Sequence, residues 1–153
     1  MLYIGSDHAG YLLKEKVKVF LHEKKVKFKD VGNTKYEPTD DYPVYGYKLA
    51  KLMKKNDKGI LICGSSFGVC IVANKVKGIR AASIATKRDA KLSRQDDDAN
   101  VCCLSGRHTS YMRAKSIITT FLNTQFSKEE RHRRRVEEIG RIERGNKPLS
   151  TRS

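Results

Sequence analysis

A cysteine followed by a turn of small residues is the first feature of this sequence that could carry chemistry. Cys63 ends the apolar run "ILIC" and is followed by Gly64, two serines and, one residue later, Gly68. A turn of this kind between a strand and a helix presents backbone N–H groups and the positive end of the helix dipole, which together can hold an anion. The same helix end can favour the thiolate form of a cysteine near neutral pH. Cysteine is also a common small buried hydrophobe, so the residues alone leave a base, a nucleophile and core filling open for Cys63.

Acidic residues and a histidine stand beside two other apolar runs. Asp7 and His8 follow "MLYIGS"; an aspartate there is commonly a helix cap, whereas a histidine can donate to an anion or act as an acid or base. Three consecutive carboxylates, residues 96–98, precede the run "NVCCLSG". Consecutive acids usually cap helices or lie in solvated loops, and no partner pattern here predicts a metal site.

The elements that must position these groups can be inferred from hydrophobic periodicity. Short apolar runs alternate with amphipathic segments, which predicts strand-helix-strand units and a parallel sheet. Strands are expected at 1–6, 26–32, 58–64, 78–84 and 100–106, and helices near 11–24, 44–55, 67–75, 86–95, 110–126 and 128–144. The predicted fold is a Rossmann-like, doubly wound, five-stranded α/β sheet with helices on both faces. Ligands bind such sheets beyond the carboxyl ends of the strands, where most of the polar and glycine residues lie.

Length and composition predict one folded domain. The chain has 153 residues, of which 39% are hydrophobic and 32% charged, a balance that a disordered chain does not have. We expect a single domain over residues 1–145 and a polar tail over residues 146–153. The sequence contains no run of 18 apolar residues and no signal-peptide pattern, so we expect a cytoplasmic protein with no membrane partner. The four cysteines lack paired or zinc-ligand spacing, which predicts reduced thiols and no metal.

The formal net charge of +15 raises the hypothesis of nucleic-acid binding, because clustered Lys and Arg bind phosphates without sequence preference. The lysines, however, are spread along the chain, and no recognition helix, RNA-binding aromatic motif or zinc pattern accompanies them. Only "RHRRR", residues 131–135, is dense, and it lies in a predicted helix. We therefore expect no nucleic-acid partner, and the arginine block needs a specific explanation.

Seven motifs together resemble the type B ribose-5-phosphate isomerases and the related galactose-6-phosphate isomerases. In order they are "SDHAG", "DYP", "ICGSSFGVCIVANK", "GIRAA", "SRQDDDAN", "SGR" and "RHRRRV". The resemblance implies a homodimer, or a tetramer, that interconverts ribose-5-phosphate and ribulose-5-phosphate in the non-oxidative pentose phosphate pathway. It implies no metal and no other cofactor. The alternatives are an isomerase of allose- or galactose-6-phosphate, a catalytically compromised homologue that still binds a sugar phosphate, and, with less support, a basic nucleic-acid-binding protein.

The resemblance also implies a role for each site residue. Cys63 would be the base that takes the proton from C2 of the open-chain sugar, and the Ser65 hydroxyl would shuttle a proton between O1 and O2. The turn would stabilise the enediolate through its backbone N–H groups. The C-terminal helix would reach the site of a partner subunit. The implied substrate-binding residues are Asp7, His8, Tyr42, Gly64, Ser66, Gly68, Asp97 and Asn100, and the implied phosphate-binding residues are His8, Arg107, Arg131 and Arg135.

Two residues depart from the family pattern. Ser66 replaces the middle glycine of the turn, which would cost energy if that position requires a positive φ. Asp96 stands where the resemblance implies a catalytic histidine that opens the sugar ring. An aspartate could serve there as a base, but near neutral pH it would be a poor acid.

Overall fold

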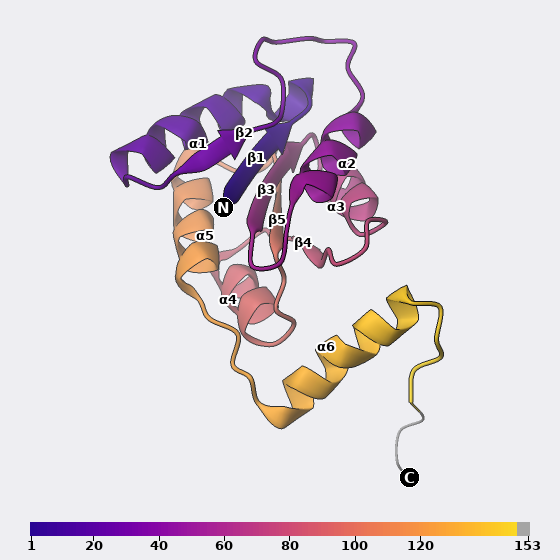
Figure 1. Ribbon diagram of the computed structural model, residues 1–153. Coiled ribbons are helices and arrows are strands. Elements are labelled where there is room, and N and C mark those ends of the chain that lie inside the picture. The colour runs from indigo at the N-terminus through magenta and orange to yellow at the C-terminus, as the bar shows by residue number, and fades with distance from the viewer. Residues whose placement is uncertain (150–153) are drawn as a thin grey trace.

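Five parallel strands form the centre of the protein, and the computed structural model describes residues 1–149 (Figure 1). Each strand pairs in parallel with its neighbours, as the alternation of strands and helices predicts. Across the sheet the strands lie in the order β2 (Phe28–Asp30), β1 (Leu2–Ser6), β3 (Lys58–Cys63), β5 (Val101–Ser105) and β4 (Ala81–Ser83). The chain reverses direction across the sheet between β1 and β3. This is the switch point beyond which doubly wound sheets bind ligands.

Helices cover both faces of the sheet (Figure 1). One face packs against α1 (Tyr11–Glu23), α4 (Lys87–Gln95) and α5 (Tyr111–Asn123), and the other against α2 (Tyr42–Leu52) and α3 (Phe67–Ala73). The central strands β3 and β5 are almost entirely buried, which explains why they read as continuous apolar runs rather than alternating ones. The predicted doubly wound α/β fold is confirmed.

The C-terminal helix α6 (Glu130–Glu143) lies apart from these layers, near the end of the sheet at which the strands begin (Figure 1). His132 is its one buried residue. At the far end of the helix, the Glu143 carboxylate accepts a hydrogen bond from the backbone N–H of Gly78 at 2.5 Å. A strongly amphipathic helix with so little buried surface leaves one face available to another molecule.

Several element boundaries differ from the prediction, and two of the differences have a clear local cause. Helix α2 begins at Tyr42 rather than near Val44, because Pro43 occupies its first turn, where proline is favoured. Strand β4 covers Ala81–Ser83 rather than 78–84. Gly78 has φ +84° and turns the chain before the strand can begin.

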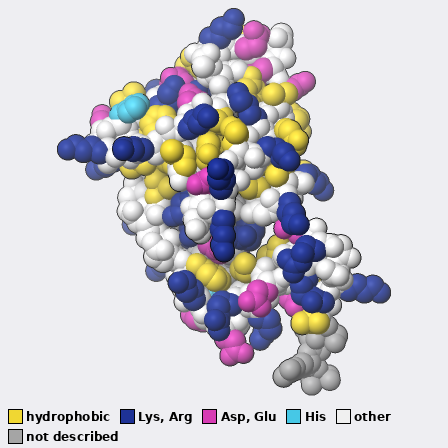
Figure 2. All heavy atoms as spheres, viewed as in Figure 1, with side chains coloured by type: hydrophobic (Ala, Val, Ile, Leu, Met, Phe, Trp, Pro, Cys, Tyr) yellow, Lys and Arg dark blue, Asp and Glu magenta, His cyan; other side chains and the backbone are white. Residues whose placement is uncertain are grey.

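The surface carries its positive charge widely, and Figure 2 shows Lys and Arg side chains over most of the visible face rather than in one stripe. None of the helices described within residues 1–149 is long and apolar enough to cross a membrane.

Candidate active site

The carboxyl ends of β1, β3 and β5 bring three of the predicted segments together. In the register of the sheet, Ser6 pairs with Ile62 and Cys63 pairs with Ser105. The turns that follow are also joined, because the N–H of Gly106 donates to the Cys63 carbonyl at 2.8 Å. The segments that begin at Asp7, Gly64 and Gly106 therefore form one continuous rim.

Close backbone packing holds this rim together. Gly10 ends the short 3-10 helix η1 (His8–Gly10), and a methyl group on its Cα would lie 2.4 Å from the Ile62 carbonyl oxygen. Only glycine allows η1 to lie this close to β3. The Asp7 carboxylate caps η1 by accepting the N–H of Gly10 at 2.9 Å, and burial raises the pKa of this carboxyl group. His8 is thereby fixed next to the carboxyl end of β3.

The turn after Cys63 has the form that the sequence predicts, and one residue in it is strained. Cys63 is buried at the end of β3, Ser65 is exposed, and helix α3 starts at Phe67. Ser66 has φ +74°, in the left-handed region that glycine occupies without penalty. Its Oγ lies 2.6 Å from Oγ of Ser83 and also donates to the Ser65 carbonyl. The position does require a positive φ, and serine adopts it with its hydroxyl anchored.

An aromatic ring and a guanidinium group lie against this turn. The Tyr42 ring packs on Gly68, where an added methyl group would lie 2.6 Å from Cε2 of the ring. The Arg107 guanidinium packs on Gly64 in the same manner, at 3.2 Å from such a methyl group to Cζ. The N–H of Arg107 donates to the Gly64 carbonyl at 3.3 Å. Tyr42 and Arg107 therefore border the Cys63 turn from two different segments.

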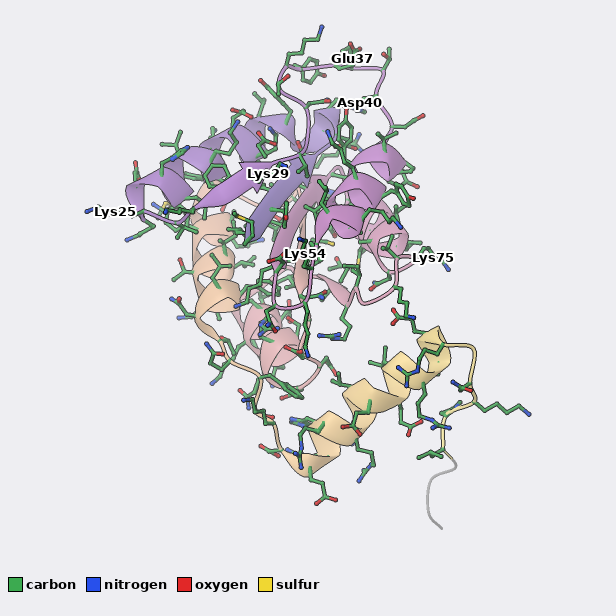
Figure 3. All side chains as sticks on the ribbon, in the orientation of Figure 1. Lys25, Lys29, Glu37, Asp40, Lys54 and Lys75 are labelled. Atoms are coloured by element: carbon green, nitrogen blue, oxygen red, sulfur yellow. The ribbon has the colours of Figure 1, made fainter. Side chains whose placement is uncertain are left out.

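A network that sequence reasoning missed supports His8. Asp40 accepts hydrogen bonds from the His8 N–H at 2.9 Å and from the His8 ring at Nδ1 at 2.8 Å. Its second carboxylate oxygen accepts from Asn33, which in turn accepts from the Tyr45 hydroxyl. Figure 3 shows Asp40 at the base of the loop between β2 and α2, whereas Glu37 lies at the tip of that loop.

The hydrogen bond that the His8 ring donates to Asp40 raises the pKa of His8, so the imidazole ring carries positive charge at higher pH than usual. Burial acts to raise the pKa of Asp40, but the hydrogen bonds from His8 and Asn33 outweigh it and lower that pKa. The Asp40–His8 pair therefore favours the charged form of each partner beside the Cys63 turn. The motif "DYP" begins one residue after Asp40, and this proximity is the one sequence signal that could have pointed to it.

Five predicted residues do not join this site within one chain. Asp96, Asp97 and Asn100 lie between the end of α4 and the start of β5, whereas Cys63 lies beside the end of β5. Asp96, Asp97 and Asn100 are therefore at the end of the sheet where the strands begin. Arg131 and Arg135 are on α6, which lies near this amino-terminal end as well (Figure 1).

These residues have local partners instead. The Asn100 amide group accepts from the Arg80 N–H and donates to the Gly78 carbonyl, both at 2.8 Å. Asp96 Oδ1 lies 3.7 Å from Nδ1 of buried His132, and this nitrogen lies 2.8 Å from Ser127 Oγ. Asp96 is therefore tied to the first turn of α6.

The thiols and possible metal ligands complete the description of the site. All four cysteines are free, and burial raises the pKa values of Cys102 and Cys103. Within residues 1–149, no cluster of three or more His, Cys, Asp or Glu side chains is arranged to hold a metal ion.

Comparison with known proteins identifies the family. The model of the Ribose/Galactose Isomerase family matches residues 2–139. The chain belongs to this family. It is 46% identical over 145 residues to "Probable ribose-5-phosphate isomerase B" of Mycoplasma pneumoniae, with 94% of this chain and 95% of the relative covered. It is 40% identical over 141 residues to "Ribose-5-phosphate isomerase B" of Escherichia coli, with 91% and 93% covered.

A solved relative also carries a bound ligand. The crystal structure of ribose-5-phosphate isomerase B from Mycoplasma genitalium with bound ribulose-5-phosphate matches with a TM-score of 0.89 and 41% identity. The match covers 94% of this chain and 95% of that chain.

Proposed function

We propose that this protein is an aldose-ketose isomerase that interconverts ribose-5-phosphate and ribulose-5-phosphate through an enediolate in the non-oxidative pentose phosphate pathway. The observation that carries the proposal is the arrangement around Cys63. A buried thiol ends a central strand, a strained turn of small residues follows it, and two cationic groups, His8 and Arg107, border the same rim. Family membership and the ribulose-5-phosphate bound by a solved relative support this substrate class.

Cys63 is the proposed base. Its thiolate would take the proton from C2 of the open-chain aldose, and the electrons of that C–H bond would form the enediolate as negative charge develops on O1. Returning the proton to C1 would give the ketose. Backbone N–H groups of the turn would stabilise the charge that develops only in this step, which is how such groups accelerate proton transfer. The exposed hydroxyl of Ser65 would move the proton between O2 and O1.

His8 and Arg107 are the proposed phosphate ligands of the same chain. Charge-assisted hydrogen bonds to phosphate are among the stronger polar interactions in proteins. Asp40 favours the protonated form of His8, because the hydrogen bond that it accepts raises the pKa of the imidazole. Asp7 and Tyr42 would contact the sugar between the thiol and the phosphate.

We also propose that the active form is a homodimer in which each chain supplies residues to the other's site. Two exposed apolar side chains on α3, Phe67 and Ile71, directly follow the Cys63 turn. A groove of about 460 Å³ lies between α6 and the body of the chain, with Ile139 and Ile142 on one side and Asp97 on the other. If α3 of a second copy occupies this groove, Asp97 comes close to the second copy's Cys63 turn.

This arrangement would also give the arginine block a purpose. Arg131 and Arg135 are four residues apart, so both lie on one face of α6, where they can converge on one phosphate. Asp96 is tied to the first turn of the same helix. Asn100 remains a prediction as a substrate ligand, since both ends of its amide are already engaged.

An assay of the purified protein with several sugar phosphates tests the function. We expect conversion of ribose-5-phosphate to ribulose-5-phosphate, measured beside allose-6-phosphate and galactose-6-phosphate. Faster turnover of either hexose phosphate would establish the alternative substrate. If no sugar phosphate is turned over but one binds, the protein is a binding homologue and not an enzyme. The expected cytoplasmic location stays a prediction, consistent with four free thiols.

Subunit mixing tests the shared site. Cys63→Ala and the double variant Arg131→Ala/Arg135→Ala should each be inactive or severely impaired alone. Unfolding and refolding them together would produce mixed dimers with one complete site, and about a quarter of wild-type activity should return. If the arginines serve the cysteine of their own chain, mixing will restore nothing.

A further inference from the structure

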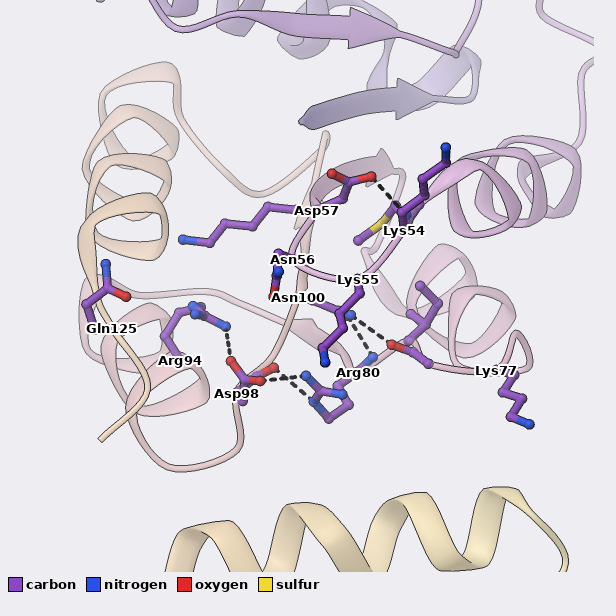
Figure 4. Close-up of a pocket in the computed structure, with 14 residues that line it drawn as sticks. Lys54, Lys55, Asn56, Asp57, Lys77, Arg80, Arg94, Asp98, Asn100 and Gln125 are labelled. Carbon is purple, nitrogen blue, oxygen red and sulfur yellow. Dashed lines mark hydrogen bonds and ion pairs between the residues drawn. The ribbon is translucent and has the colours of Figure 1, made fainter. Parts of the chain in front are cut away.

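A second cavity lies at the amino-terminal ends of β3, β4 and β5, opposite the Cys63 rim. It encloses about 540 Å³ between the loop after α2, the loop before β4, and the segment that joins α4 to β5. Figure 4 shows these lysine, arginine, asparagine and aspartate side chains around the same space. The charged residues that line it are Lys54, Lys55, Asp57, Lys58, Lys77, Arg80, Arg94 and Asp98.

The cavity has a large excess of positive charge. One carboxylate, Asp98, serves two arginines: its Oδ2 lies 2.7 Å from Arg80 and its Oδ1 lies 2.8 Å from Arg94. The other carboxylate, Asp57, accepts the backbone N–H of Lys54 at 2.8 Å and so fixes its own loop. Within residues 1–149, no carboxylate lies within ion-pair distance of the four lysine ammonium groups in the lining. Six cationic residues thus line one cavity that contains two committed anions. Lys55, Arg80 and Arg94 lie around its centre, whereas the Lys54 and Lys77 side chains point outward (Figure 4).

The surroundings of Lys58 in this cavity disfavour its positive charge. Its Nζ donates to the Leu122 carbonyl at 2.9 Å, and an ammonium group has three N–H donors. Burial and the nearby charge of Arg94 lower the pKa of Lys58, while Asp98 acts in the opposite direction. An anion in the cavity would relieve this disfavoured charge.

The walls of the cavity are fixed by the fold. Each of its three loops contains a residue with positive φ, namely Asn56 at +73°, Gly78 at +84° and Asp98 at +48°. Arg94 is buried and donates to the Ala99 and Thr124 carbonyls as well as to Asp98. Asn100 joins the floor of the cavity to the loop before β4 through two hydrogen bonds of its side-chain amide. The floor of the cavity would therefore need little reorganisation to receive a ligand.

We propose that this cavity is a binding site for a small oligophosphate, such as the di- or triphosphate group of a nucleotide. Its volume lies within the range of small-molecule sites. The cations line several walls of one concave space, which suits a compact multivalent anion better than an extended nucleic-acid backbone. Lys54, Lys55 and Lys77 are exposed, while Lys58 and Arg80 lie deeper. Lys54 and Lys77, which point outward in Figure 4, would turn inward to cover the anion. The cavity lies at the opposite end of the sheet from the Cys63 rim of the same chain, so a ligand bound here would not occupy that rim.

Titration calorimetry with inorganic tripolyphosphate at about 0.15 M salt tests the proposal. We expect saturable binding of one anion per chain in the presence of saturating ribose-5-phosphate, together with a rise in the unfolding temperature. Lys55→Ala/Lys77→Ala should weaken binding by about tenfold or more. The charge-matched control Lys25→Ala/Lys29→Ala, whose lysines lie beside α1 and β2 away from the cavity (Figure 3), should change it less than about twofold.

Three results would overturn the proposal. Competition by ribose-5-phosphate would assign the anion to the Cys63 rim instead. Equal losses in the two double variants would indicate general charge attraction and not a site. Affinity for single-stranded DNA that increases with its length and exceeds that for tripolyphosphate would indicate a nucleic-acid surface. Lys58→Met provides an independent check, since it should abolish the anion-dependent rise in unfolding temperature while the isomerase assay reports an intact fold.

Discussion

Ser66 offers the sharpest test of how the turn after Cys63 is built. The residue occupies the left-handed region at φ +74° and is buried, and its hydroxyl lies 2.6 Å from that of Ser83. Two opposing terms therefore meet at one position. The backbone would favour glycine, whereas the hydrogen bond favours serine.

The magnitudes of these terms can be separated with two substitutions. A non-glycine residue in the left-handed region costs roughly 1–2 kcal/mol, and a partly buried hydroxyl hydrogen bond contributes about 0.5–1.5 kcal/mol. Ser66→Ala loses the bond and keeps the strain, so it should lower the free energy of unfolding by about 1 kcal/mol. Ser66→Gly loses the bond but also the strain, so its free energy of unfolding should stay within about 1 kcal/mol of wild type.

Urea unfolding followed by circular dichroism, with all variants at one protein concentration, measures the difference. The glycine variant should be more stable than the alanine variant by about 1–2 kcal/mol. Ser83→Ala serves as the control for the hydroxyl, because it should destabilise wild type but have almost no effect in the glycine background. An alanine variant as stable as the glycine variant would refute the strain argument.

Three further predictions concern the proposed catalytic chemistry. Because Asp40 raises the pKa of His8, phosphate affinity should be complete below the ordinary histidine pKa of about 6.5 and should fall as pH rises through the raised value. In measurements of KM against pH, Asp40→Asn should show this fall at lower pH than wild type, and the loop control Glu37→Gln should show it at the wild-type pH. A midpoint shared by all three proteins would contradict the role of Asp40. Cys63→Ala should lower kcat by roughly 10²-fold or more with little change in ligand affinity, whereas the control Cys70→Ala should keep most of the activity. Near-normal turnover by Cys63→Ala would show that another group is the base. Asp96→His should increase turnover of ribose-5-phosphate, roughly 10-fold or more if ring opening limits the rate. It should leave unchanged the turnover of a four-carbon aldose phosphate, which cannot close a furanose ring. A loss of turnover with both substrates would show that Asp96 itself contributes to catalysis.

The fold was predictable because its strongest signals are local. The strands β3 and β5 are covered on both faces and therefore appear as unbroken apolar runs, and the amphipathic segments between them must return the chain to the same edge of the sheet. The Cys63 turn was predictable for the same reason, since a strand, its turn and its helix are contiguous. The boundary of β4 was not predictable, because it depends on hydrogen bonds with the side-chain amide of Asn100, about 20 residues later in the sequence.

The supporting groups of the site were less visible because they depend on tertiary contacts. Asp40 is 32 residues from His8, in a loop whose composition resembles any other polar connection. Its position beside the motif "DYP" could point to the site but not to its contact with His8. The strain at Ser66 could be anticipated only as a condition on φ, and the structure supplies the angle.

The positions of the implied residues at the two ends of the sheet bear on the proposed homodimer. The thiol, His8 and Arg107 stand at the carboxyl ends of β1, β3 and β5. Five other implied residues stand at the opposite end, namely Asp96, Asp97, Asn100, Arg131 and Arg135. A change of side-chain rotamer cannot carry a residue from one end of this sheet to the other, because helices pack on both faces of the sheet. Either those distant residues have no part in catalysis or a second copy of the chain supplies them. The exposed Phe67 and Ile71 beside the thiol, and the apolar groove beside Asp97, favour delivery by a second copy. On this account dimerisation is a step in forming the active site, and activity should disappear on dilution at the concentration at which the dimer dissociates.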